Sequence, residues 1–81
     1  MTELNKKEET ILKKWLESKG ISIHLGKRLK SGNYYLIEHI SDLNVLVYNS
    51  DARGEYYDSE SDAFGIASIK SLDYLLNSNQ N

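Results

Sequence analysis

The feature that most constrains this sequence is the run from Asn33 to Asn49, which holds its densest group of β-branched and aromatic residues. Such residues favour strands, and the Ser41-Asp42 pair near the middle is typical of a turn, so the run predicts a β-hairpin. A two-residue turn there would pair apolar residues on both faces of the hairpin. The pairs are Ile40 with Leu43, Leu36 with Val47, Ile37 with Leu46 and Tyr35 with Tyr48.

A ribbon that is apolar on both faces belongs in the middle of a fold, so the rest of the chain is expected to cover it. A three-residue turn would change the pairing, and this alternative stays open because Ser-Asp specifies a two-residue turn less strongly than Asn-Gly. Glu38 is the exception within the run, since it shares a side with Leu36 and Ile40. Burial of an unpaired carboxylate costs several kcal/mol, so we expect Glu38 at the rim of the sheet or paired with a Lys.

A helix is predicted over residues 5–19. Asn5 followed by Glu8 matches a capping box, and Gly20 supplies a stop signal. Its apolar stripe consists of Ile11, Leu12, Trp15 and Leu16. Because Trp15 is the largest apolar side chain of this stripe, we expect it to anchor the core.

The segment between this helix and the hairpin alternates Ile21, Ile23, Leu25 and Leu29 with polar or small residues. That period predicts a strand with one wet face, at the edge of the sheet. After the hairpin, residues 51–54 have the composition of a turn, and residues 55–58 could form a short fourth strand. Ser68 is expected to cap a final helix ending near Asn77, with an inward stripe of Ile69, Leu72, Leu75 and Leu76.

These elements predict an α+β domain over residues 1–77. Its sheet would be a three- or four-stranded antiparallel meander, with the N-terminal helix packed on one face and a short C-terminal helix closing the other side or end. Residues 78–81 form a polar tail with nothing to bury, which we expect to be disordered. The order helix, three strands, helix resembles that of double-stranded RNA-binding domains, whose second helix begins with a lysine cluster. Here the predicted final helix begins Ser68-Ile69-Lys70-Ser71, with a single lysine.

Composition argues against several kinds of chemistry. The 81 residues include no Cys and no Pro, which excludes disulfides, thiolate zinc sites and cysteine nucleophiles. No nucleophile elbow, paired-carboxylate motif or glycine-rich phosphate loop is present, so we expect no enzyme activity and no cofactor. His24 and His39 are interpreted as surface or hairpin-end residues rather than metal ligands or catalysts. Without a leader or a long apolar run, the protein is expected to be cytoplasmic.

The acidic run Asp58, Glu60, Asp62 matches the first ligand positions of a calcium loop. However, the sixth position is Ala63, where the loop requires Gly, and the twelfth is Ile69, where it requires a bidentate Glu. We therefore expect no metal site in this segment.

Charge is unevenly divided along the chain. Residues 1–40 carry eight basic and five acidic residues, a net of +3, whereas residues 41–81 carry two basic and seven acidic residues, a net of −5. Such a division favours electrostatic recognition of a partner. The leading hypothesis is a small non-enzymatic protein-binding module, such as an inhibitor or regulator, that docks on the basic surface of another protein. Its predicted contact residues combine carboxylates with tyrosines: Asp51, Glu55, Tyr56, Tyr57, Asp58, Glu60 and Asp62. A homodimer stays open.

The alternative is a nucleic-acid-binding domain. It would use cations against phosphates and aromatic rings against bases. The candidate residues are Lys27, Arg28, Lys30, Tyr34 and Tyr35. The net charge of −2 makes this the less favoured hypothesis.

Overall fold

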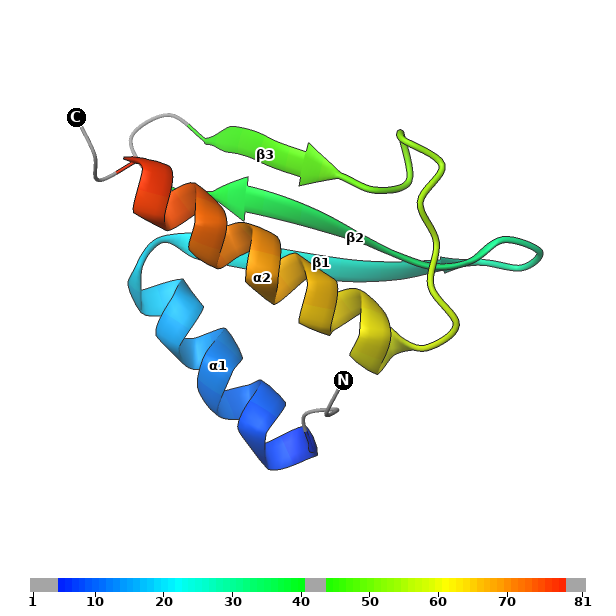
Figure 1. Cartoon of the computed structure of the whole chain (residues 1–81), viewed down its shortest axis with the longest axis horizontal. Coiled ribbons are helices and arrows are strands. Elements are labelled where there is room, and N and C mark those ends of the chain that lie inside the picture. Colours follow the sequence, from blue (N-terminus) through cyan, green and yellow to red (C-terminus); the bar gives the residue numbers. More distant parts are fainter. Residues whose placement is uncertain (1–4, 41–43, 79–81) are drawn as a thin grey trace.

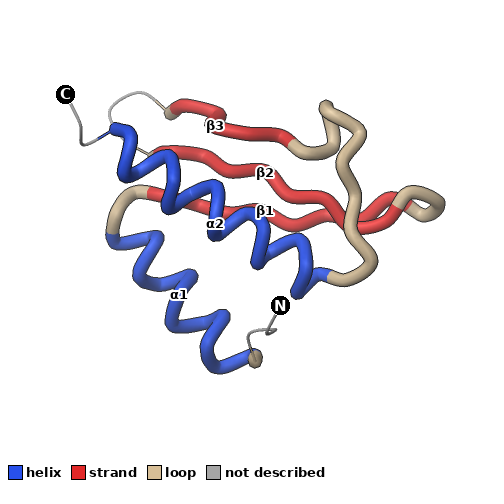
Figure 2. The backbone as a smooth tube through the Cα atoms, in the orientation of Figure 1, coloured by secondary structure: helices blue, strands red, loops and turns tan. Residues whose placement is uncertain are grey.

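A computed structural model describes residues 5–40 and 44–78 of the chain. In chain order, its elements are α1 (Lys6–Ser18), β1 (Ile21–Arg28), β2 (Gly32–His39), β3 (Val45–Asn49) and α2 (Glu60–Ser78). The three strands form one antiparallel sheet in the order β1-β2-β3. Both helices lie against one face of the sheet (Figures 1 and 2). The predicted α+β class and element order are confirmed, and residues 79–81 of the predicted tail lie outside the described residues.

Helix α1 begins and ends as its sequence predicts. The backbone N–H of Glu8 donates to Oδ1 of Asn5 at 2.8 Å, and the backbone N–H of Asn5 donates to Oε1 of Glu8 at 3.0 Å, which completes the capping box. Beyond the last turn, Gly20 adopts a φ of 85° and its N–H donates to the carbonyl of Glu17. These contacts are local, so a short sequence is enough to specify them.

The core lies between the helices and the odd-numbered residues of the first two strands. The register pairs Ile23 with Ile37 and Leu25 with Tyr35, so these side chains share a face. The buried apolar side chains are Leu16, Ile21, Ile23, Tyr35, Ile37, Ala63, Phe64 and Ala67. The expected alternation along β1 holds for Ile21 and Ile23, but Leu25 is exposed and Leu29 falls in the turn after the strand. As predicted, β1 is an edge strand.

The prediction that Trp15 anchors the core is wrong. Trp15 is 44% exposed and Ile11 is 60% exposed, whereas the neighbouring Leu16 is only 1% exposed. The ammonium of Lys19 lies 5.6 Å from the centre of the Trp15 ring, on the outer surface of α1. One apolar stripe can meet the sheet at different rotations of the helix, and here Leu16, with Leu12 beside it, faces the core.

The prediction for the last helix is also wrong in its start and its position, and of its predicted inward stripe only Leu75 packs against the core. Helix α2 begins at Glu60, where the hydroxyl of Ser59 accepts from the N–H of Asp62 at 3.0 Å. Ser68 lies inside the helix and donates its hydroxyl to the carbonyl of Phe64. The buried face consists of Ala63, Phe64, Ala67, Ser68 and Ser71, while Ile69, Leu72 and Leu76 are exposed. Helix α2 packs these residues on the sheet face that α1 also covers, so no described helix covers the opposite face.

The predicted hairpin is present, but its two-residue-turn register is wrong. Ile37 pairs with Tyr48, and Glu38 pairs with Leu46, with a bulge between these pairs. The predicted bend at Ser41-Asp42 lies outside the described residues. The predicted fourth strand, residues 55–58, is only a single bridge to the start of β2. In this bridge, Asn33 and Tyr57 exchange backbone hydrogen bonds of 2.9 and 2.8 Å. This bridge places residues 56–58 beside the first turn of α2.

Candidate functional site

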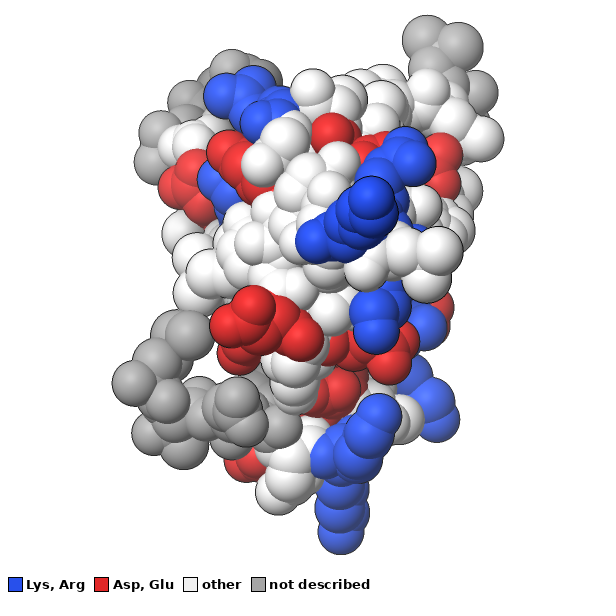
Figure 3. Space-filling view, turned by 90° about the vertical axis from the view of Figure 1, so that its right-hand side faces the viewer, with Lys and Arg blue, Asp and Glu red and all other residues white. Residues whose placement is uncertain are grey.

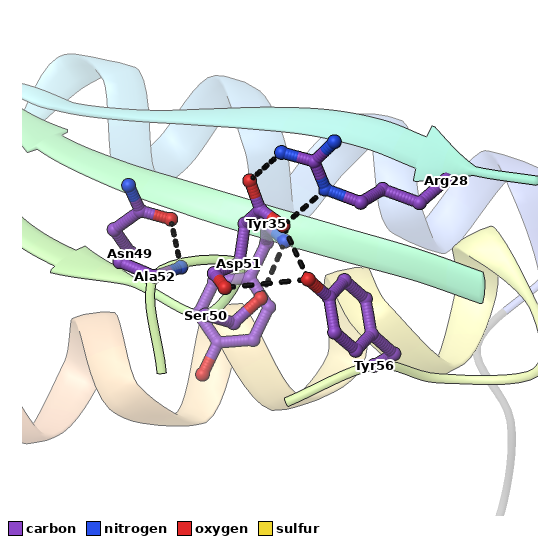
Figure 4. A network of polar contacts seen from close by, with 7 residues as sticks. All are labelled: Arg28, Tyr35, Asn49, Ser50, Asp51, Ala52 and Tyr56. Carbon is purple, nitrogen blue, oxygen red and sulfur yellow. Dashed lines mark hydrogen bonds and ion pairs between the residues drawn. The ribbon is translucent and has the colours of Figure 1, made fainter. Parts of the chain in front are cut away.

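The acidic region predicted to bind a partner is divided by the fold, and its first carboxylate joins the predicted basic cluster. Nε and Nη2 of Arg28 donate to the two oxygens of Asp51 at 2.6 and 2.7 Å. The hydroxyl of Tyr56 donates to Oδ1 of the same carboxylate at 2.5 Å (Figure 4). The Arg28 guanidinium also lies 5.9 Å from the centre of the Tyr34 ring. Asp51 therefore joins Arg28 and Tyr56 at the end of the open sheet face, and its carboxylate does not project freely toward a partner.

These contacts shift the titration of their members. The hydrogen bonds from Arg28 and Tyr56 lower the pKa of Asp51 from 3.8 to about 2, because both stabilise the carboxylate form. The hydrogen bond to Asp51 raises the pKa of Tyr56, since ionisation would remove the donated proton. The same carboxylate raises the pKa of Arg28 above its ordinary value.

Ser50 attaches the segment that carries Asp51 to the sheet, and nothing in its sequence context marked it out. It is fully buried, its N–H donates to the carbonyl of Tyr35 at 3.0 Å, and its Oγ accepts from the N–H of Tyr35 at 2.9 Å. Its own carbonyl accepts from the N–H groups of Arg53 and Glu55. A serine that ends a strand has no distinctive sequence pattern, so only the tertiary pairing with Tyr35 reveals its role.

Glu55 is also engaged within the chain. Its Oε1 accepts from the hydroxyl of Tyr48 at 2.5 Å, and its Oε2 lies 3.8 Å from Nε of Arg53. The hydrogen bond to Glu55 raises the pKa of Tyr48. Asp51 is thus paired with Arg28, and Glu55 is held by the Tyr48 hydroxyl with Arg53 nearby, so both carboxylates have partners within the chain.

The remaining predicted contact residues, apart from Glu60, line one groove. A surface groove of about 360 Å³ is lined by Tyr56, Tyr57, Asp58, Asp62 and Ile66. It lies between the 56–58 segment and the start of α2, and the Tyr57 ring packs 5.9 Å from the buried Tyr35 ring. Within the described residues, neither Asp58 nor Asp62 forms a salt bridge. Glu60, the last predicted contact residue, is exposed at the first position of α2.

The predicted nucleic-acid cluster is dispersed. Tyr35 is 0% exposed, so its ring cannot stack on a base, and Arg28 is bound by Asp51. Lys30 is exposed in the turn, while Lys27 lines a separate hollow together with Asp58 and Glu60. On the end of the molecule drawn in Figure 3, basic and acidic side chains are interspersed and do not separate into two faces. The uneven charge along the sequence therefore does not create one basic face at this end.

The two histidines lie on opposite faces of the sheet. Nε2 of His24 is 2.7 Å from Oε1 of Glu38 on the open face. The partner of Glu38 is therefore a histidine, whereas the sequence predicted a lysine or a position at the rim. On the helix-covered face, Nδ1 of His39 is 3.0 Å from the hydroxyl of Tyr74. In the described part of the chain, no three His, Asp or Glu side chains gather to form a metal site. No helix in that part has the length and apolar character needed to cross a membrane.

Replacement of Asp51 by Asn is expected to weaken the acid dependence of stability. Because the folded-state pKa of Asp51 is depressed, its contribution is present above pH 3.8 and is lost as the pH falls toward about 2. Thermal melts of Asp51→Asn between these values should therefore change less with pH than melts of the parent protein. Asp73→Asn removes an exposed carboxylate of α2 and serves as the control. Equal pH slopes for Asp51→Asn and the parent would contradict the assignment.

Comparisons with known proteins found no similar protein that could guide the interpretation of this site. No protein-family model, no curated protein sequence and no solved structure matches this chain. The groove beside Tyr57, the network around Asp51 and the open sheet face are therefore interpreted from their own contacts. These contacts assign the acidic residues to two groups, one with partners within the chain and one lining the groove beside Tyr57.

Proposed function

We propose that this chain is a non-enzymatic protein-binding module that holds a basic side chain of its partner in the groove formed by Tyr56, Tyr57, Asp58, Asp62 and Ile66. The single observation that carries this proposal is the groove itself, because it is lined by two tyrosines and by two carboxylates that have no salt-bridge partner among the described residues. Aromatic rings attract a cation through their faces, and carboxylates supply hydrogen-bond acceptors.

The surroundings support a preformed groove. The bridge between Asn33 and Tyr57 attaches one wall to the sheet, and the Ser59 cap of α2 positions Asp62 on the other wall. The bond from Tyr56 to Asp51 orients the ring at the open end. Preorganised walls reduce the entropy that is lost on binding. The role of Asp51 in this proposal is to position Tyr56, while Asp58 and Asp62 provide the direct contacts.

The same geometry argues against the nucleic-acid alternative. Helix α2 begins with Glu60 and Asp62, whereas double-stranded RNA-binding domains carry lysines at the start of their second helix. Phosphates approaching Lys27 would also meet Asp58 and Glu60, which line the same hollow. With Arg28 paired and Tyr35 buried, Lys27, Lys30 and Tyr34 remain as contacts for that function.

The test is an NMR titration of the isotope-labelled protein with an arginine-rich peptide, compared with a peptide in which every Arg is replaced by Gln. We expect the basic peptide to shift the amide signals of the groove residues, and the double variant Asp58→Asn, Asp62→Asn to bind about tenfold more weakly at low salt. The matched control, Glu17→Gln with Asp73→Asn, removes the same charge from exposed positions outside the groove. Thermal melts of both variants establish that the fold is retained.

Binding by the groove variant that equals binding by the parent would refute the proposal, as would equal losses in the groove variant and the control. The nucleic-acid alternative is tested in parallel by retention of nuclease-sensitive material from a cell lysate. Its matched variant is Lys27→Gln with Lys30→Gln, because substitution of Arg28 would also release Asp51 and Tyr56. Loss of retained material in this variant alone would favour nucleic-acid binding.

A further inference from the structure

The outer edge of β3 is the least protected edge of the sheet. Strand β3 lies at the end of the sheet, and no described strand pairs with its outer side (Figure 1). Its five residues include no charge and no Pro, and Val45 and Leu46 are 46% and 54% exposed. The opposite edge strand, β1, carries Lys27 and Arg28 and contacts α1. Charged residues within the strand and covering elements normally prevent an edge from pairing with another chain. Strand β3 itself carries no charged residue, and no described strand pairs with its outer side.

Two cations converge on one ring beside this edge. Nζ of Lys70 lies 4.4 Å from the centre of the Tyr48 ring, and the guanidinium carbon of Arg53 lies 5.2 Å from the same centre. Arg53 and Lys70 are the only basic residues in the acidic half of the chain, residues 41–81. Arg53 is partly compensated by Glu55, whereas no carboxylate within the described residues lies within 4 Å of the Lys70 ammonium. Lys70 is therefore a cation beside the edge with no carboxylate partner among the described residues, whereas Arg53 shares Glu55 with the Tyr48 hydroxyl.

A surface groove lies next to this edge. It has a volume of about 460 Å³ and lies between β3 and α2, lined by Val47, Tyr48, Lys70, Asp73, Tyr74 and Asn77. Because Asp73 also lines it, an incoming anion would lie toward Tyr48 and the two cations. A strand edge beside a groove is the geometry by which sheets accept an extended peptide, with main-chain bonds supplying affinity and side-chain pockets supplying specificity.

We propose that the outer edge of β3 binds an extended peptide segment of a partner protein, with an acidic side chain of that segment held by Arg53 and Lys70 beside Tyr48. The backbone of the segment adds a strand to the sheet. Alternate side chains of an added strand point toward the face that carries α2, so one of them reaches the groove. The carboxylate supplies Lys70 with the partner that it lacks among the described residues and shares Arg53 with Glu55, through charge-assisted hydrogen bonds. This surface is separate from the groove at Tyr57, and it presents the cations of Lys70 and Arg53.

The test uses short peptides of alternating Val and Thr in which one Glu occupies each position in turn. Matched peptides carry Gln in place of Glu, and a further set carries N-methyl groups that block main-chain pairing. We expect the best Glu peptide to shift the amide signals of β3 and to bind about tenfold more tightly than its Gln counterpart. The N-methylated peptide should not bind. In the variant Arg53→Gln, Lys70→Gln, the preference for Glu over Gln should disappear, whereas Lys27→Gln, Lys30→Gln should retain it.

Three results would overturn the proposal. The first is that no peptide shifts the signals of β3, and the second is that Glu and Gln peptides bind equally to the parent protein. The third is that the β3 signals move with protein concentration and sedimentation shows a dimer, which would assign the edge to a second copy of this chain. Because the groove residues around Tyr57 are unchanged in every variant, these results are independent of the arginine-peptide titration.

Discussion

Replacement of Leu16 by Ala is expected to destabilise the protein by about 2 to 5 kcal/mol, because it empties part of the buried core. Leu16 is 1% exposed and belongs to the core cluster that joins α1 to β1 and α2. Truncation removes its buried methyl groups and leaves a cavity that rigid neighbours cannot fill. A domain of this size has a total stability of only about 4 to 12 kcal/mol, so the variant could be substantially unfolded at room temperature. Urea denaturation followed by circular dichroism measures the loss.

The neighbouring Trp15 provides the control for this prediction. Because its ring is 44% exposed, Trp15→Ala removes contact area at the surface but opens no internal cavity, and should cost about 1 to 2 kcal/mol. Both residues belong to the same apolar stripe of α1, so the comparison isolates which side of that stripe faces the sheet. A larger cost for Trp15→Ala than for Leu16→Ala would show that α1 is rotated relative to the described packing.

Replacement of Gly32 by Ala is expected to cost about 2 to 4 kcal/mol, from two causes that act together. Gly32 has a φ of 117°, which a residue with a Cβ rarely adopts. A Cβ placed there would also lie 2.8 Å from the backbone carbonyl oxygen of Tyr57. That carbonyl accepts from both the N–H and the side-chain amide of Asn33, so the substitution would disturb the bridge that attaches the groove wall to the sheet. Loss of stability and weaker binding of the arginine-rich peptide are therefore expected together.

Gly54 allows the two causes to be separated. It also has a positive φ, of 72°, but no atom lies within 4 Å of a Cβ built on it. Gly54→Ala should therefore carry only the conformational penalty, about 1 kcal/mol, and leave peptide binding unchanged. The difference between the two variants, measured by denaturation, reports the overlap with Tyr57. Equal costs at Gly32 and Gly54 would show that the 56–58 segment can move away without penalty.

Local patterns predicted the elements well where the determining contacts are local. Asn5, Glu8 and Gly20 specify the ends of α1 because their hydrogen bonds lie within a few residues of one another. The alternation in β1 and the β-branched run after it likewise predicted three antiparallel strands. The start of α2 was missed because Ser59 and Ser68 are equally suitable caps by residue type, and only packing of Ala63 and Ala67 on the sheet distinguishes them.

The candidate site was predicted in composition but not in arrangement. The sequence placed Asp51 in an acidic surface and Arg28 in a rival basic one, yet the two residues are joined by two hydrogen bonds across 23 positions. The sequence gives the number of charged side chains, but it does not show which of them pair with each other in the folded protein. Likewise, Arg53 and Lys70 are isolated along the chain; the turn after β3 and the packing of α2 bring them to Tyr48.

By itself, the sequence determined the class of fold, the order of its elements, the ends of α1 and the excess of acid in the second half, because propensity, capping and charge are properties of short segments. The tertiary structure alone decided which side of each helix is buried and which face of the sheet stays open. It also decided that Asp51 and Glu55 have partners within the chain while Asp58 and Asp62 line a groove. These choices depend on contacts between residues far apart in the chain, whose energies are settled only when the strands pair and the helices pack.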